Sequence, residues 1–169
     1  AVITDSSGYP IVAWREQILD DPWQIYLKYW DGAVWDDYAD SATGTGLSNT
    51  GGRSSEFVSV VSSSSNDLFV SWTEADDFYG NVFLKKWDGS VWDEMAGSCS
   101  PGGISGSNYV RSTTGALVLD SNDNPIVAWK EGTYTRQVYL KQYSLGSWQP
   151  MGDSATNGGI SNSVNGISS

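Results

Sequence analysis

Short apolar runs alternate with polar turn segments along the whole chain, and the same runs recur at a regular spacing. The clearest run occurs three times, as YPIVAWRE (9–16), DLFVSWTE (67–74) and NPIVAWKE (124–131). The tryptophans within it lie 58 and 57 residues apart: Trp14, Trp72 and Trp129. A period of this length is typical of repeat architectures. The pattern therefore predicts one domain made of three copies of a single unit, at approximately 1–57, 58–115 and 116–169.

Each copy divides into four short apolar segments separated by turn signals, which predicts four β-strands per repeat. The first strand is EFVSVV (56–61) or GALVLD (115–120), the second is PIVAW, the third is VYLK and its relatives, and the fourth crosses the second Trp of WDGSVW. The second strand is apolar on both faces, which indicates a sheet covered on both sides. Radially stacked propeller blades meet this requirement. The predicted fold is all-β, with three four-stranded β-propeller blades.

The repeat motif D-S-x-x-N-P-x-V-A-W … V-Y-L-K-x-W-D-G-S-x-W, spread over essentially the whole chain, resembles the tandem repeats of bacterial secreted β-propeller proteins. The Trp-Asp-Gly turns are more loosely similar to those of short-chain propeller lectins, including the fucose-binding type. The ligand-binding Arg and Glu of those lectins do not map onto this repeat, so no site is transferred from them. The resemblance implies a fold and leaves the activity open, because such propellers serve as adhesins, lectins, scaffolds and accessory modules.

Three blades are fewer than the four to eight that closed propellers use. The first strand is also expected to be split between the two ends of the chain, Ala1–Asp5 and Asn165–Ser169. We therefore expect homodimerisation that completes a six-bladed ring. A longer natural propeller of which this chain is one half, and fibres built by open head-to-tail addition, are the alternatives.

The composition excludes several classes of function. The net charge is −11, which disfavours nucleic acid and membrane surfaces as partners, and no apolar run is long enough to cross a bilayer. The chain has no His, which removes histidine-dependent catalytic triads, histidine bases and histidine metal sites. No metal or cofactor is expected; the acidic turn at 120–124 is interpreted as hairpin chemistry rather than a Ca²⁺ loop. Cys99, the only cysteine, is expected to be a small buried side chain.

Few Lys and many Ser, Gly, Asn and Trp residues favour an exported protein, located outside the cell or at its surface. The chain does not begin with Met, which we interpret as processing or excision.

Two charged positions recur in every copy and are candidate ligand-binding residues. A glutamate follows the second-strand Trp by two residues, and a lysine lies near the end of the third strand: Glu16, Glu74, Glu131, Lys28, Lys85 and Lys141. A cross-strand ion pair within each blade is the favoured interpretation. The alternative is that each Glu accepts hydrogen bonds from sugar hydroxyls.

The loops between the second and third strands carry aromatic residues beside polar ones, namely Trp23, Phe78, Tyr79 and Tyr134. An exposed ring can stack on the C–H face of a pyranose. The alternative is that these rings pack on the adjoining blade. The mid-strand Trp14, Trp72 and Trp129 are expected in the core, and a second set in the packing between blades: Trp35, Trp92 and Trp148.

These features predict an extracellular, non-catalytic binding or adhesion module, and the specific hypothesis is a multivalent carbohydrate-binding propeller with one shallow site per blade. A structural scaffold, a fibre-forming surface module or a fragment of a larger exported propeller is the alternative. A two-carboxylate glycosidase is a minor third possibility. The recurring Glu residues argue against it, because a propeller enzyme usually has one unique site, and the Ser-x-Asp-x-Gly-x-x-Trp box of sialidases is absent.

Overall fold

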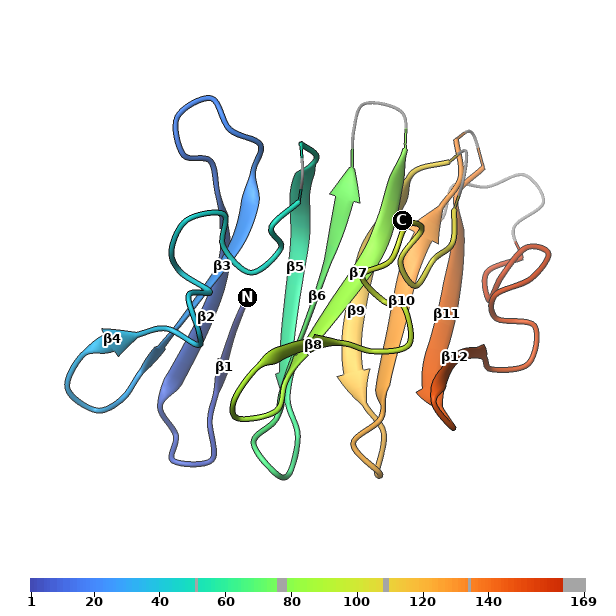
Figure 1. The fold of residues 1–169 in the computed structure, drawn as a ribbon. Coiled ribbons are helices and arrows are strands. Elements are labelled where there is room, and N and C mark those ends of the chain that lie inside the picture. The colour runs from blue at the N-terminus through green and yellow to red at the C-terminus, as the bar shows by residue number, and fades with distance from the viewer. Residues whose placement is uncertain (51, 76–78, 108–109, 134, 163–169) are drawn as a thin grey trace.

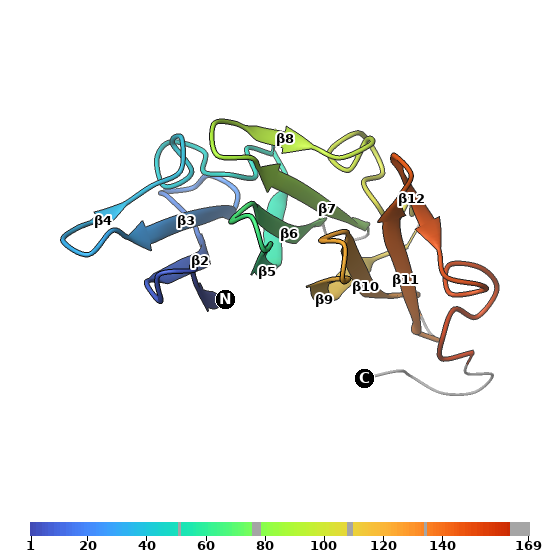
Figure 2. The ribbon, with the colours of Figure 1, turned by 90° about the horizontal axis from the view of Figure 1, so that it is seen from below.

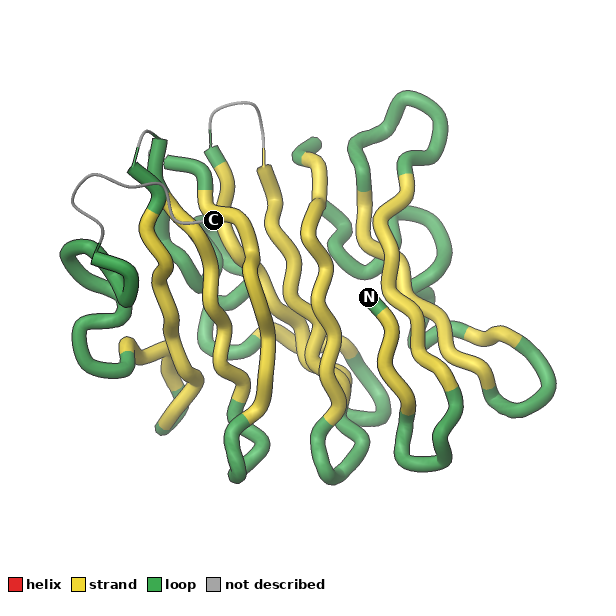
Figure 3. Tube along the Cα trace, turned by 180° about the vertical axis from the view of Figure 1, so that it is seen from behind, coloured by secondary structure: helices red, strands yellow, loops and turns green. Residues whose placement is uncertain are grey.

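The computed structural model consists of twelve β-strands in three four-stranded sheets. It describes residues 1–169 except 51, 76–78, 108–109, 134 and 163–169. The described residues form strands, turns and loops and contain no helix (Figure 3), which confirms the all-β prediction. Accordingly, no helix in that part of the chain has the length and apolar character needed to cross a membrane.

Each sheet takes four consecutive strands in chain order, all paired antiparallel (Figure 1). We call them the first, second and third sheets. The first contains β1 (Val2–Thr4), β2 (Pro10–Glu16), β3 (Gln24–Trp30) and β4 (Trp35–Asp36). The second contains β5 (Ser54–Ser62), β6 (Leu68–Ala75), β7 (Gly80–Trp87) and β8 (Trp92–Glu94). The third contains β9 (Ser112–Leu119), β10 (Pro125–Glu131), β11 (Gln137–Ser144) and β12 (Ser147–Pro150).

The acidic turns act as hairpin turns, as the sequence predicts. The Asp120 carboxylate accepts the backbone N–H groups of Asn122 and Asn124, both within 2.9 Å. Asp5 holds the first hairpin in the same way, with the N–H groups two and four residues further on. Such side-chain acceptors stabilise tight turns because they satisfy amides that the strands leave unpaired.

The first strands of the second and third sheets begin earlier than predicted, at Ser54 and Ser112 rather than at Glu56 and Gly115. Ser55 lies opposite Glu74 in the β5–β6 pair, and a bulge follows between Glu56 and Ser59. Serine favours turns locally, but here pairing with the full length of the neighbouring strand extends the sheet into the Ser-rich segment.

The sheets stack face to face in a row that fans around one side. Figure 2 shows β5 and β9 on the inner side of this fan and β4, β8 and β12 on the outer side. The first junction packs Ile11, Ala13, Ile25 and Leu27 of the first sheet against a face of the second sheet. The second junction packs the opposite face of the second sheet against the third. The row is open at both ends.

The segments that link the sheets fold back on the third strand of the sheet they leave. In the second sheet, the Ile104 N–H donates to the Val82 carbonyl at 2.7 Å. Gly103 precedes it with φ +53°, and a Cβ at this position would lie 2.2 Å from the same carbonyl oxygen. The same arrangement recurs at Gly46–Leu47 on Ile25 and at Gly159–Ile160 on Val138. A glycine is required here because its missing side chain permits both the conformation and the close approach.

The tryptophans differ between the covered and the uncovered sheet faces. Trp72 and Trp129 are buried, as predicted for the core. Their counterpart Trp14 is only half-buried, because its face of the first sheet has no neighbouring sheet. On the fourth strands, the indoles of Trp92 and Trp148 each donate to a carbonyl of the preceding sheet's linking segment, at 2.8 Å, whereas Trp35 is 46% exposed.

Candidate functional site

The three recurring glutamates lie at equivalent positions at the ends of β2, β6 and β10. Each carboxylate accepts a hydrogen bond from the indole N–H of the tryptophan two residues earlier, at 2.8 Å for Glu16, 3.2 Å for Glu74 and 3.0 Å for Glu131. Residues two apart on a strand share one face, which explains why this pair recurs with the motif. The glutamates therefore have a structural role in every sheet.

The prediction of a cross-strand Glu–Lys ion pair is wrong: no such pair forms among the described residues. Strand register places Glu74 opposite Asn81, and Lys85 opposite Val70, which precedes Glu74 by four residues in β6. Four residues of strand separate backbones by about 13 Å. The Lys85 ammonium instead donates to the Leu47 carbonyl in the preceding linking segment at 2.8 Å. Lys141 makes the equivalent contact with the Ile104 carbonyl at 2.7 Å, so these lysines join neighbouring sheets.

The predicted loop aromatics are only partly described. Phe78 and Tyr134 lie outside the described residues. Trp23 is half-buried and its ring is covered by the Arg15 guanidinium, 4.6 Å from the ring centroid. Tyr79 is 40% exposed and lines a cavity. Of the two described rings, Tyr79 is therefore the one that lines a candidate site.

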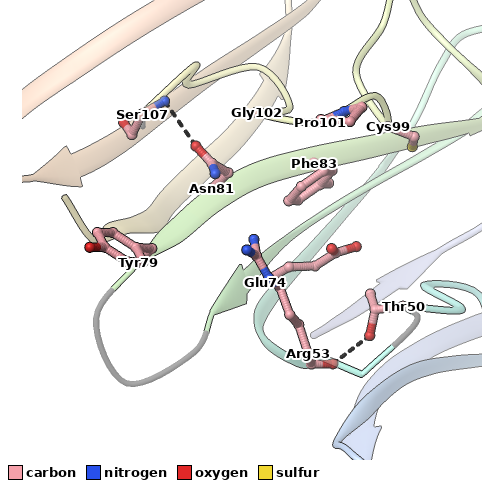
Figure 4. A pocket seen from close by; sticks show the side chains of 10 residues that line it. All are labelled: Thr50, Arg53, Glu74, Tyr79, Asn81, Phe83, Cys99, Pro101, Gly102 and Ser107. Atoms are coloured by element: carbon pink, nitrogen blue, oxygen red, sulfur yellow. Dashed lines mark hydrogen bonds between the residues drawn. The ribbon is translucent and has the colours of Figure 1, made fainter. Parts of the chain in front are cut away.

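That cavity lies beside the ends of β6 and β7, between the linking segments that precede and follow the second sheet (Figure 4). Its volume is about 570 Å³. It combines one carboxylate, one guanidinium, one amide and several hydroxyls with aromatic rings. The residues that line it are Thr50, Arg53, Glu74, Tyr79, Asn81, Phe83, Cys99, Pro101, Gly102 and Ser107.

Glu74 and Asn81 are the polar side chains positioned by the strands themselves. Burial raises the pKa of Glu74, while the Trp72 indole, Arg53 and Lys85 act in the opposite direction. Asn81 is 5% exposed, and its side-chain oxygen accepts the N–H of Ser107 at 2.9 Å. Its nitrogen lies on the side away from Ser107 (Figure 4) and forms no hydrogen bond within the described part of the chain. The cavity thus offers a carboxylate acceptor and an amide donor from adjacent strands.

A second cavity of about 590 Å³ occupies a related place in the first sheet. Gln24 and Tyr26 line it at the positions that Asn81 and Phe83 take in the second sheet, and Thr50 replaces Ser107. The Gln24 side chain bonds the Ser48 and Thr50 hydroxyls at 2.8 and 2.9 Å. The two cavities therefore share a position in the repeat, an amide side chain and a buried ring, but Glu16 does not line the second cavity and Pro22 stands there in place of Tyr79.

The third copy uses the same groups differently. The Glu131 carboxylate accepts hydrogen bonds from the Ser112 hydroxyl at 2.9 Å and from the Ser107 hydroxyl, in addition to the Trp129 indole. With three protein donors, this carboxylate is satisfied by the protein itself.

Cys99, which also lines the first cavity, is half-buried, and its thiol donates to the Leu84 carbonyl at 3.1 Å. Burial raises its pKa to about 11. The side chain is therefore a neutral thiol at physiological pH, and it is half-buried rather than buried as the sequence predicts.

Sequence reasoning identified Glu74 and Tyr79 but missed Arg53, Asn81, Thr50 and Ser107. One signal was available, because the third strand carries an amide residue at its first or second position in all three copies: Gln24, Asn81 and Gln137. Among the described residues, no group of three or more Cys, Asp or Glu side chains could hold a metal ion.

The chain was compared with known protein families, curated proteins and solved structures. No protein-family model, curated protein or solved structure matches the chain.

Proposed function

We propose that the three sheets are blades of a β-propeller and that the chain is a non-catalytic binding module for carbohydrate, acting outside the cell or at its surface. The stacking supports the propeller arrangement: antiparallel sheets of four sequential strands fan around a common inner side (Figure 2), with the same junction formed twice. The composition, poor in Lys and rich in Ser, Gly, Asn and Trp, supports an exported location.

The observation that carries the proposal is the recurrence, in two successive repeats, of a cavity that combines polar side chains with at least one aromatic ring. Sugars present hydroxyls that donate and accept hydrogen bonds, together with apolar C–H faces. Glu74 supplies an acceptor, the Asn81 amide supplies a donor, and the rings of Tyr79 and Phe83 supply apolar surface. Few convergent polar groups on an otherwise apolar wall are typical of small-molecule sites. Repeated shallow sites gain strength through multivalency.

A neutral ligand fits better than an anionic one. The chain carries a net charge of −11, which repels polyanions. The cavity also holds Glu74 as the one carboxylate among its described lining residues, whereas glycoside hydrolysis uses two facing carboxylates. This supports binding without hydrolysis.

Binding of immobilised neutral glycans, followed by calorimetry with the best of them, tests the proposal. Glu74→Gln keeps an oxygen for the Trp72 indole and removes the charged acceptor, and Tyr79→Ala removes the exposed ring. Each is expected to weaken the second-sheet site by about tenfold, the equivalent of one hydrogen bond or stacking contact. Asp93→Asn is the matched control, because this exposed β8 carboxylate makes no hydrogen bond or ion pair to the described residues. The absence of binding to any neutral glycan would overturn the proposal. So would an unchanged affinity and number of sites, measured by calorimetry, in the Glu74→Gln, Tyr79→Ala double variant with an intact fold, because the first-sheet cavity alone should then remain.

A further inference from the structure

The two outer sheet faces of the row are the unmatched halves of a junction that the chain already forms twice. At both internal junctions, the preceding sheet contributes a mainly aliphatic face together with its linking segment, and we call this the leading face. The following sheet contributes a face that carries Trp and Lys, and we call this the trailing face. The first sheet has an uncovered trailing face, which contains Val12, Trp14, Lys28 and Trp35. The third sheet has an uncovered leading face, which contains Ile126, Val138, Leu140 and Ile160.

Burial at equivalent positions shows what each uncovered face lacks. Leu47 and Ile104, at the tips of the first two linking segments, are 3% and 2% exposed, whereas Ile160 is 56% exposed. Similarly, Val60 and Leu117 are both 4% exposed, whereas Val2 is 66% exposed. The linking-segment side chains are therefore buried where a following sheet covers them, and the first-strand side chains where a preceding sheet covers them.

The trailing face of the first sheet contains a hollow of about 250 Å³ lined by Val12, Trp14, Lys28 and Trp35. In the second sheet, Val70 and Trp72 occupy the corresponding positions, and Leu47 of the preceding linking segment packs in the same cluster. In the third sheet, Ile104 packs in one cluster with Val127 and Trp129. A residue such as Ile160 is thus the natural occupant of the hollow.

The hydrogen bonds of the internal junctions point to the same occupant. Lys85 and Lys141 donate to the carbonyls of Leu47 and Ile104. Trp92 and Trp148 donate to the carbonyls of Tyr38 and Met95. On the first sheet, the equivalent donors are Lys28 and Trp35, and neither forms a hydrogen bond within the described residues. The matching carbonyls on the third sheet are those of Ile160 and Met151.

We infer that a second copy of this chain docks head-to-tail on these faces. Ile160 of one copy enters the hollow on the first sheet of the other, Lys28 donates to the Ile160 carbonyl, and Trp35 donates to the Met151 carbonyl. Two such contacts between two copies are equivalent and close a ring of six sheets. The second contact forms within the complex, so closure strengthens the first. This assembly rests on the repeated junction and does not depend on the proposed ligand.

Sedimentation velocity at micromolar concentration tests the inference with two single variants and their mixture. Val12→Glu places a carboxylate on the trailing face, and Ile160→Glu places one on the leading face. Burying an unpaired charge is costly, so each variant alone is expected to raise the dimer dissociation constant at least about a hundredfold. Leu145→Glu is the control. This residue is 102% exposed in the β11–β12 turn. The corresponding turn of the second sheet, Asp88–Gly89, is exposed although that sheet has a neighbour on each face, so Leu145 should stay outside the contact.

The equimolar mixture distinguishes head-to-tail docking from any other association. A Val12→Glu chain retains its leading face and an Ile160→Glu chain retains its trailing face, so the mixture can form one intact contact. The expected result is a dimer in the wild type and in Leu145→Glu, monomers for each single variant with wild-type circular dichroism, and a dimer in the mixture. A wild-type monomer would overturn the docking, a mixture that stays monomeric would overturn its head-to-tail geometry, and a growing series of larger species would overturn ring closure.

Discussion

Gly103 is a position at which one added methyl group should disturb the fold directly. Its backbone has φ +53°, and an alanine Cβ would lie 2.2 Å from the Val82 carbonyl oxygen and 3.0 Å from its carbon. Both neighbours are backbone atoms of a central strand, so neither can rotate away. The linking segment must therefore withdraw from β7.

The expected cost follows from what the withdrawal breaks. A left-handed alanine costs about 1–2 kcal/mol. Loss of the 2.7 Å bond from the Ile104 N–H to Val82 costs about 0.5–1.5 kcal/mol more. Ile104 is 2% exposed and packs with Val127 and Trp129, so partial exposure adds about 1–2 kcal/mol. We expect Gly103→Ala to lower the free energy of unfolding by about 3–5 kcal/mol.

Gly106→Ala provides the matched control. Gly106 has φ +70°, and a Cβ there would meet nothing within 4 Å, so only the conformational cost of about 1–2 kcal/mol applies. Urea unfolding followed by tryptophan fluorescence and circular dichroism measures both variants. The slope of unfolding free energy against urea concentration must equal that of the wild type for the stabilities to be compared. Equal destabilisation by the two substitutions would refute the close-approach argument.

Three further outcomes are expected. The pKa of about 11 leaves so little Cys99 thiolate at pH 8 that iodoacetamide should react about a hundredfold more slowly with the folded chain than with the chain in urea, and equal rates would contradict this. Burial raises the pKa of Glu74, so the folded state binds the proton more tightly than the unfolded state. The stability gained from this proton is fully present below the ordinary pKa of 4.5 and is lost as the pH rises through the pKa of the folded state. Urea unfolding should therefore show Glu74→Gln gaining stability relative to wild type between pH 4 and pH 7, and parallel curves would refute it. Ser98→Ala removes a bond of 2.7 Å to the Leu84 carbonyl and one of 2.8 Å from the Met95 N–H, which should cost about 1–3 kcal/mol in the same assay; an unchanged urea midpoint would count against it.

The strands and their order could be predicted from the sequence because their signals are local. A repeated tryptophan, apolar runs of strand length and acidic turns such as Asp120–Asn124 act over a few residues, and the structure follows them closely. The first strands were less predictable. Ser54 and Ser112 extend them because a partner strand is present, which serine-rich sequence does not signal.

Only some residues of the candidate site could be predicted from the sequence, because the others come together through tertiary packing. Glu74 and Tyr79 stood out as a recurring charge and a loop aromatic. Arg53 and Ser107 did not, because they come from the linking segments on either side of the second sheet and meet only after the sheets stack.

The amino-acid sequence by itself determined that this chain is all-β, repeated three times, with four strands in each copy. These properties depend on backbone preferences and on periodicity, which neighbouring residues encode. Only the tertiary structure decided what the recurring charges do. Glu74 turns back to the indole of its own strand, and Lys85 reaches the preceding sheet, because strand register separates two residues that sequence spacing had suggested were partners.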